Sequence, residues 1–390
     1  MEQERKRLLF VTYGLGIGGI EKCLVNLLNA LPESRYDVDL LVIDPEYAMK
    51  SQIRRQVNFL DPFLYTLNTE FTMAEIRNRG GIRRHIRMLL PYIGYRLRIK
   101  LGLPVWAKFP PIEKTYDVAV AYSQNGIGPY YVIDKVSAGR KVLWYHNGAY
   151  ECTGKQYELD KRYYNRFDTI VAVSQDCANV LKEKFPFAKE KITVLRNLCD
   201  AEKIRSDAEA FIPGGFSGDA AHIVTVGRLS REKGADLALE ACRMLCSEGR
   251  NLVWHWVGDG PQAPEIQKQV QSLGLEGRFR LEGNQSNPYP FIRGADLYVQ
   301  PSYYEAYSTT VTEAKVLCRP MVVTDVGGMR DQLTNGKTAR IVPVDAAAIA
   351  DAIRELLDTP DRAAGFSREL AGEDFDPSAA LEEYERTVFS

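Results

Sequence analysis

Short runs of apolar residues, separated by polar stretches, recur along most of this chain of 390 residues. In the first half the runs are nearly continuous rather than alternating, which indicates strands that are buried on both faces of a parallel sheet. The predicted strands of this half are 8–12, 38–43, 118–121, 141–145 and 169–173. After the first strand the apolar positions Leu24, Leu27, Leu28 and Leu31 follow helical spacing. Strands that alternate with helices predict a doubly wound α/β domain.

The pattern is interrupted after residue 197 and then resumes. Residues 213–219 are rich in glycine and polar side chains, as is typical of a domain boundary. A second series of predicted strands follows at 223–226, 253–257, 278–281, 297–300, 320–324 and 340–342. We therefore expect two doubly wound domains, at 1–200 and 201–376. A final helical segment, 377–390, is expected to pack away from the second sheet.

The composition supports a folded chain and excludes some partners. Hydrophobic residues make up 45% and charged residues 26%, and the formal net charge is -1, so no overall field attracts nucleic acid. The seven cysteines contain no C-x-x-C pair, which predicts reduced thiols with packing roles. Neither a signal peptide nor a run of about 20 apolar residues is visible. We expect a cytoplasmic protein, with peripheral attachment to the inner face of the plasma membrane as an option.

A glycine-rich loop joins the first predicted strand to the first helix. Gly14, Gly16 and Gly19 satisfy G-x-G-x-x-G, and Asp44 ends the next strand, which is one arrangement of a dinucleotide site. The physical requirement is broader, because glycines before a helix let backbone N–H groups approach any anion. A simple tight turn also explains these glycines. We interpret Gly18 and Gly19 as a wall of a site whose ligand this loop does not specify.

Two loops of the second half place polar groups where open α/β sheets bind ligands. Arg228 and Lys233 follow a strand and open a helix, and two cations at a helix entrance suit a diphosphate. A solvated charged turn is the alternative. Gly283 and Asn284 follow another strand, where they could present polar groups to a base or ribose or form a turn.

Glu305 and Glu313 are the two acidic residues of a strand-loop-helix segment, whose helix begins near Ser308. Eight helical residues rise about 12 Å, whereas the two carboxyl groups of a glycosidase stand roughly 5 to 9.5 Å apart. The pair is therefore predicted to hold two ends of a long ligand. Backbone N–H groups of Ser308 and Thr309 would point toward a phosphate. Alternatively, Thr310-x-x-Glu313 is a capping box.

Two further residue patterns have both a functional and a structural interpretation. His146 follows the strand at 141–145, so it could face a site or be a core histidine. Asp37-Val38-Asp39 matches the metal-binding D-x-D pattern, but both acids lie at the wrong end of the sheet, and we interpret them as structural.

Together, four elements of the chain resemble glycosyltransferase family 4. They are Glu305-x7-Glu313, Gly227-Arg228-Leu229 with Glu232-Lys233-Gly234, Gly18-Gly19-x-Glu21, and His146 after a strand. The resemblance covers nearly the whole chain and is strongest from Ile223 to Pro343. It implies the GT-B architecture, in which two Rossmann-like domains face each other across a cleft, with the C-terminal helix returning to the N-terminal domain. It also implies a retaining, metal-independent reaction without a cofactor.

The resemblance assigns expected roles to single positions. Glu305 would bind the donor sugar, Glu313 the ribose, Arg228 and Lys233 the diphosphate, and His146 the sugar from the opposite domain. The remaining donor-binding positions would be Gly18, Gly19, Gly283, Asn284, Tyr307, Ser308 and Thr309. Ala306 departs from the frequent glycine, which leaves the identity of the sugar open. A UDP-hexose is the favoured donor and a GDP-sugar the second.

The segment 77–108 is basic and interleaved with apolar residues, and it has no acid from Arg77 to Lys108. Such a segment can lie in an anionic membrane interface or form a surface helix with a solvated basic face. The first interpretation favours a lipid-linked acceptor over a free glycan, in cell-surface polysaccharide synthesis. An NAD(P)-dependent oxidoreductase, a sugar-nucleotide epimerase and a non-catalytic binding module are the alternatives.

Overall fold

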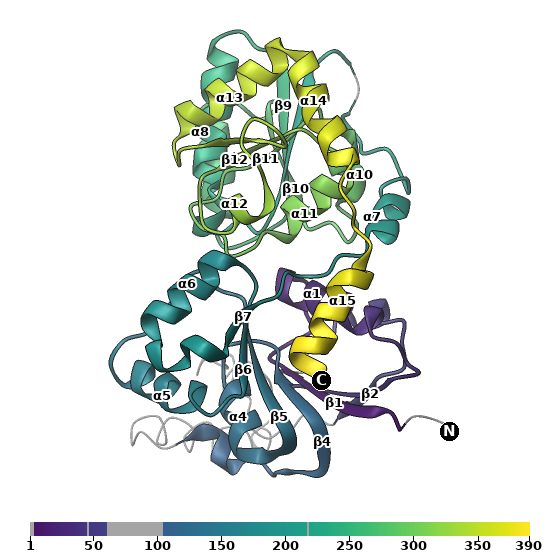
Figure 1. Ribbon diagram of the computed structural model, residues 1–390. Helices are drawn as coiled ribbons and strands as arrows, with labels where there is room; N and C mark the ends of the chain where they lie inside the picture. Colours follow the sequence, from purple (N-terminus) through teal and green to yellow (C-terminus); the bar gives the residue numbers. More distant parts are fainter. Residues whose placement is uncertain (1–3, 45–46, 61–103, 217) are drawn as a thin grey trace, which may run out of the picture.

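The computed structural model describes residues 4–44, 47–60, 104–216 and 218–390, and it contains two parallel β-sheets, one above the other (Figure 1). The first sheet has seven strands in the order β3-β2-β1-β4-β5-β6-β7 among the described residues. Their bounds are β1 Lys6–Thr12, β2 Tyr36–Val42, β3 Asn58–Leu60, β4 Ile112–Ala121, β5 Val136–Tyr145, β6 Thr169–Ala172 and β7 Ile192–Val194. The order reverses between β1 and β4, and the carboxyl ends at such a switch point form a ligand-binding crevice.

The second sheet repeats this plan with six strands in the order β10-β9-β8-β11-β12-β13 within the described part of the chain. Their bounds are β8 Ala221–Val226, β9 Leu252–Val257, β10 Phe279–Gly283, β11 Leu297–Gln300, β12 Met321–Thr324 and β13 Arg340–Val342. Here the switch point lies between β8 and β11. Both switch points face the space between the two sheets, as the site residues below show.

Helices cover both faces of each sheet. Among the described residues of the N-terminal half, the α-helices are α1 Gly19–Ala30, α4 Gly128–Lys135, α5 Gly154–Tyr164 and α6 Gln175–Lys184. Those that follow are α7 Ala201–Asp207, α8 Ala235–Ser247, α9 Ala263–Ser272, α10 Tyr289–Gly294, α11 Thr309–Val316, α12 Met329–Gln332, α13 Ala346–Asp358, α14 Pro360–Ala371 and α15 Pro377–Tyr384.

Successive residues of each strand enter opposite hydrophobic clusters, which explains the continuous apolar runs. In β1, Leu9 and Val11 belong to one cluster, and Leu8 and Phe10 belong to the cluster on the other face. The second sheet is likewise covered by one cluster on each face. The predicted fold class, two doubly wound α/β domains, is confirmed.

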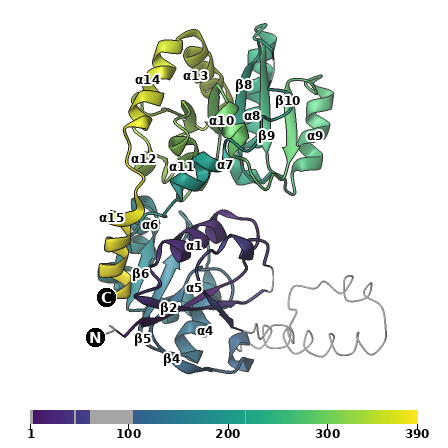
Figure 2. The ribbon, with the colours of Figure 1, turned by 90° about the vertical axis from the view of Figure 1, so that its right-hand side faces the viewer.

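The C-terminal segment crosses back to the first sheet. In Figures 1 and 2, α15 leaves the upper half and ends beside β1. Tyr384, Val388 and Phe389 are buried in the cluster that contains Phe10, and the Lys6 ammonium donates to the Phe389 carbonyl at 2.8 Å. Burial of these apolar side chains ties the end of the chain to the N-terminal sheet, as expected.

The sequence led to two predictions about membranes, one on spanning helices and one on the basic segment 77–108. In the described part of the chain, no helix is both long and apolar enough to cross a bilayer. The basic segment 77–108 lies largely outside the described residues, which stop at residue 60 and resume at residue 104. Its interpretation stays a prediction.

Candidate active site

A cleft of about 2850 Å³ runs between the two sheets and is lined by both halves of the chain. The N-terminal half contributes the glycine loop, α1 and the loop after β5, and the C-terminal half contributes loops after β8, β9, β10 and β11. Eleven sequence-predicted site residues line the cleft: Gly18, Gly19, His146, Arg228, Lys233, Asn284, Glu305, Tyr307, Ser308, Thr309 and Glu313. Gly283 does not line it, although it shapes the loop that presents Asn284.

Glu305 and Lys233 form a buried ion pair at the switch point of the C-terminal sheet. Lys233 Nζ lies 2.7 Å from Glu305 Oε1, and the Glu305 side chain is 7% exposed. The same oxygen accepts hydrogen bonds from Ser302 Oγ at 2.8 Å and from Gln300 Nε2 at 3.4 Å. This network fixes the carboxylate and keeps the ammonium in the cleft.

Glycines allow the close backbone packing that positions this pair. Gly234 follows Lys233 with φ 71°, and a Cβ there would lie 2.0 Å from the carbonyl oxygen of Pro301. Beneath Glu305, Gly328 donates its N–H to the Glu305 carbonyl, and a Cβ on Gly328 would lie 2.0 Å from the carbonyl oxygen of Ala306. Only glycine lets backbone approach backbone this closely.

Glu313 is held by a partner that the sequence did not indicate. Its Oε1 forms a short ion pair with Nζ of Lys22 from α1 in the opposite half, and that ammonium lies 4.7 Å from the centre of the Tyr289 ring. Burial opposes the charge on Lys22, but the Glu313 carboxylate and Tyr289 raise its pKa above the ordinary value. Glu313 is 3% exposed, so its charge is desolvated.

The capping-box interpretation of Glu313 is wrong, because α11 is capped by Ser308 rather than by Thr310. The Ser308 hydroxyl accepts from the N–H of Val311, and the helix begins at Thr309. The N–H of Ser308 donates to Oε1 of Gln332 at 2.8 Å, so this amide is already paired. Thr309 faces the opposite half, since a Cβ on Gly19 would lie 3.4 Å from its hydroxyl.

His146 lies at the end of β5 and is nearly buried, with 9% of its surface exposed. The ring Nε2 lies 3.0 Å from the carbonyl oxygen of Tyr122. The backbone N–H of His146 donates to Oε1 of Gln124 at 3.0 Å. Burial lowers the pKa of His146 to about 4, so the ring is neutral at physiological pH. Because the carbonyl requires a proton on Nε2, Nδ1 is left as an acceptor for a hydroxyl.

Arg228 and Asn284 present polar groups from neighbouring loops. The Arg228 side chain is exposed, and its guanidinium makes no hydrogen bond to any of the described residues. Asn284 accepts from the N–H of Asp259 at 3.1 Å, which joins the loops after β9 and β10. The guanidinium is thus available to an anion, whereas the Asn284 oxygen is already engaged.

The D-x-D sequence is structural, as expected. Asp39 is buried and accepts from the Tyr116 hydroxyl at 2.7 Å and from Lys114 at 3.0 Å. Asp37 pairs with Arg5 at 3.1 Å. Neither acid lines the cleft.

Sequence patterns also missed a polar cluster on the N-terminal wall of the cleft. The buried Asp160 accepts from the Tyr150 hydroxyl at 2.6 Å, from Gln156 at 2.9 Å and from the Tyr130 hydroxyl. Burial raises the pKa of Asp160 against these hydrogen bonds. All four residues line the cleft, and no motif in the sequence distinguishes Asp160 from the other charged residues of α5.

Comparisons with known proteins agree with this geometry. Residues 17–203 match the family model described as "Glycosyltransferase Family 4", and residues 207–370 match the family model described as "Glycosyl transferases group 1". Glycogen synthase of Mycobacterium tuberculosis is 26% identical over 92% of this chain and 88% of its own length. Alpha-D-kanosaminyltransferase of Streptomyces kanamyceticus is 33% identical, but that match spans 36% of this chain and 37% of the relative.

Solved structures show the same fold. The Anabaena protein Alr3699/HepE in complex with UDP and glucose superposes with a TM-score of 0.74 at 18% identity, covering 99% of this chain and all of that chain. TarM gives a TM-score of 0.71 at 15% identity over 99% of both chains.

Two doubly wound sheets that face each other across a cleft form the GT-B fold, which this chain shares with the solved structures. The chain belongs to glycosyltransferase family 4, since the two matching descriptions together extend over most of its length. This membership sets aside the oxidoreductase, epimerase and binding-module alternatives.

Proposed function

We propose that the protein is a retaining, metal-independent glycosyltransferase that transfers a hexose from a nucleotide diphosphate sugar. UDP is the favoured nucleotide and GDP the second. The acceptor is a glycan or a lipid-linked sugar in cell-surface polysaccharide synthesis. The observation that carries this proposal is the Lys233–Glu305 pair in a cleft whose opposite wall presents the neutral His146.

The chemistry of transfer suits these groups. The bond between the anomeric carbon and the phosphate oxygen breaks, and its electron pair leaves with the diphosphate. Arg228 and Lys233 are cations placed to neutralise this developing charge, which lowers the barrier. Glu305 and Nδ1 of His146 accept hydrogen bonds from sugar hydroxyls and orient the ring. The acceptor hydroxyl then bonds to the anomeric carbon on the face that the diphosphate leaves, and its proton passes to an oxygen of the departing diphosphate.

One observation supports a ribonucleotide in the C-terminal half, and a second favours UDP. Glu313 lies at the second switch point with one carboxylate oxygen, Oε2, that is buried and has no hydrogen-bond partner among the described residues. Such an oxygen suits a ribose hydroxyl, because a buried acceptor without a partner is costly. Structural neighbours of this chain were solved with UDP, with UDP-glucose, and with UDP beside a glycan.

The acceptor side of the proposal rests on the N-terminal wall. The cluster of Tyr130, Tyr150, Gln156 and Asp160 offers aromatic faces and a carboxylate, groups that suit a sugar. Membrane attachment rests on the segment 77–108 alone. Flotation with anionic liposomes tests it, and a variant with reversed charges at residues 83, 84 and 87 that floats equally well would contradict it.

A thermal-shift panel tests the donor class, since a ligand bound only by the folded state raises the melting temperature. UDP or GDP should raise it, and NAD should not; the reverse result would end the proposal. With the nucleotide known, mass spectrometry of reactions with a panel of its sugars and candidate acceptors identifies the product. Glu305→Ala should abolish transfer and leave the protein folded.

A further inference from the structure

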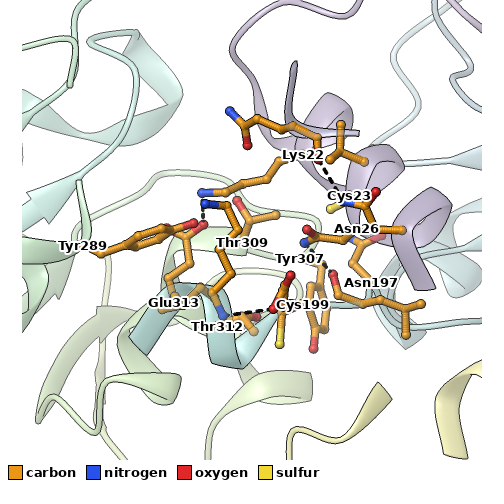
Figure 3. Close-up of a pocket in the computed structure, with 17 residues that line it drawn as sticks. Lys22, Cys23, Asn26, Asn197, Cys199, Tyr289, Tyr307, Thr309, Thr312 and Glu313 are labelled. Carbon is orange, nitrogen blue, oxygen red and sulfur yellow. Dashed lines mark hydrogen bonds and ion pairs between the residues drawn. The ribbon is translucent and has the colours of Figure 1, made fainter. Parts of the chain in front are cut away.

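The pairing of Lys22 with Glu313 joins the two halves of the chain inside the cleft. Lys22 projects from α1, and Glu313 projects from α11, 291 residues later in the sequence. In Figure 3 the lysine side chain extends from its helix to the carboxylate, and the Tyr289 ring lies beside both. The side chains of Lys22 and Glu313 are only 25% and 4% exposed, so solvent screens this contact weakly.

Lys22 and Lys233 each compensate the negative charge of one buried carboxylate in the cleft. Glu305 and Glu313 are both buried acids in a cleft proposed to bind a diphosphate, and like charges repel. Each carboxylate is paired with one lysine, Glu305 with Lys233 and Glu313 with Lys22. Lys233 belongs to the same half of the chain as Glu305. Lys22 belongs to the half opposite Glu313.

The geometry of Glu313 shows what the pairing leaves available. Lys22 takes Oε1, whereas Oε2 is buried and has no partner within the described part of the chain. The pairing therefore need not be broken when a ribose hydroxyl donates to Oε2. Without Lys22, the same carboxylate would be a buried charge without compensation, which is strongly unfavourable.

We propose that Lys22 completes the nucleotide site of the C-terminal half from the N-terminal half, because it compensates the buried charge of Glu313 and leaves Oε2 of that carboxylate as an acceptor for the nucleotide. This inference rests on the proposed function, because it assumes a nucleotide at Glu313. Lys22 is a positioning residue, since it acts on the ligand through the carboxylate. The nucleotide affinity of the C-terminal half is then coupled to a residue of the N-terminal half.

Calorimetric titration with UDP, or with GDP if the thermal shift selects it, tests the coupling. Lys22→Met should raise the Kd of the nucleotide at least tenfold, and Lys22→Arg should recover most of the affinity. Glu313→Gln removes the charge that Lys22 compensates. In that background Lys22→Met should change the Kd by less than about threefold, because a neutral amide needs no cation.

Lys114→Met is the matched control. It also removes the lysine partner of a buried carboxylate, Asp39, in the N-terminal half, but neither residue lines the cleft. Its nucleotide affinity should equal that of the wild type. Equal losses of affinity from Lys22→Met in the wild-type and Glu313→Gln backgrounds would overturn the inference, as would no loss in either.

Hydrogen exchange of the α1 amides provides a second readout, because a defect confined to the carboxylate of Glu313 would not change their protection. The nucleotide should protect the amides of α1 in the wild type and in Lys22→Arg, but not in Lys22→Met at a saturating concentration. Protection of α1 in Lys22→Met equal to that in the wild type would contradict the coupling. If the wild type binds neither UDP nor GDP, the proposed function itself fails. If the wild type binds the nucleotide and Lys22→Met binds it equally well, only the inference on Lys22 fails.

Discussion

Gly148 allows the closest approach of the two walls near the proposed sugar site, and its replacement by alanine is a sharp test of cleft geometry. A Cβ at this position would lie 3.2 Å from Cα of Ala306, 3.2 Å from the Tyr304 hydroxyl and 3.3 Å from the Glu305 carbonyl oxygen. Its φ is not left-handed, so alanine introduces no backbone strain there. The perturbation is therefore steric and confined to the contact across the cleft.

The size of the effect follows from these distances. Carbon atoms in contact normally lie about 3.5 to 4.0 Å apart, so the walls must separate by roughly 0.3 to 0.8 Å. A displacement of about 1 Å in a catalytic site can lower the rate about 100-fold. We therefore expect Gly148→Ala to lower kcat/KM about four- to 40-fold. Gly328→Ala should lower it about 100-fold or more, because its Cβ would lie 2.0 Å from the Ala306 carbonyl oxygen.

The assay is release of the nucleotide from the donor sugar that the screen selects, with the melting temperature measured in parallel. Gly277→Ala is the matched control, because a Cβ there meets nothing within 4 Å and its φ is not left-handed. It should leave kcat/KM unchanged. If Gly148→Ala and Gly277→Ala were equally active, the two walls would not need this approach during catalysis, and the reasoning would be refuted.

Three further predictions follow from named contacts. Lys233→Met should lower kcat/KM about 100- to 1000-fold by removing a cation from the leaving group. Arg340→Met removes a cation of similar exposure from an ion pair outside the cleft, and it should leave turnover unchanged. Burial lowers the pKa of His146 to about 4, so its contribution to stability is full above pH 6.5 and is lost as the pH falls from 6.5 toward 4. The free energy of unfolding should fall by up to about 3 kcal/mol over that window, and His146→Asn should lack this part of the slope in urea titrations. Phe389→Ala should cost about 3 to 5 kcal/mol in the same titrations, because the ring is buried against the N-terminal sheet. A loss below about 1 kcal/mol would mean that the segment Glu385–Phe389, which follows α15, adds little to stability.

The central strands were predictable because burial on both faces produces continuous apolar runs. The expected strand at 8–12 corresponds to β1, and that at 297–300 matches β11. The edge strands β3 and β7 were missed, since each has three residues and only partial burial, which gives no such run. Short edge strands depend on pairing with a neighbour, and pairing leaves no periodic signal in the sequence.

Residues at strand ends were predictable for the same topological reason. His146, Lys233 and Glu305 all follow predicted strands, and the carboxyl ends of parallel strands meet at one edge of a sheet, so all three reach the cleft. Lys22 and Asp160 lie on helices, where a charged residue usually marks a solvated face. Their functions depend on partners brought together by the tertiary fold, and for Lys22 the partner is 291 residues away.

A structure of the complex with the nucleotide that raises the melting temperature shows directly whether Lys233, Arg228 and Glu313 hold the donor. Diphosphate oxygens should lie within hydrogen-bonding distance of Lys233 Nζ and the Arg228 guanidinium, and a ribose hydroxyl should donate to Oε2 of Glu313. A nucleotide bound instead along the glycine loop, with its ribose on Asp44, would rule out this donor site.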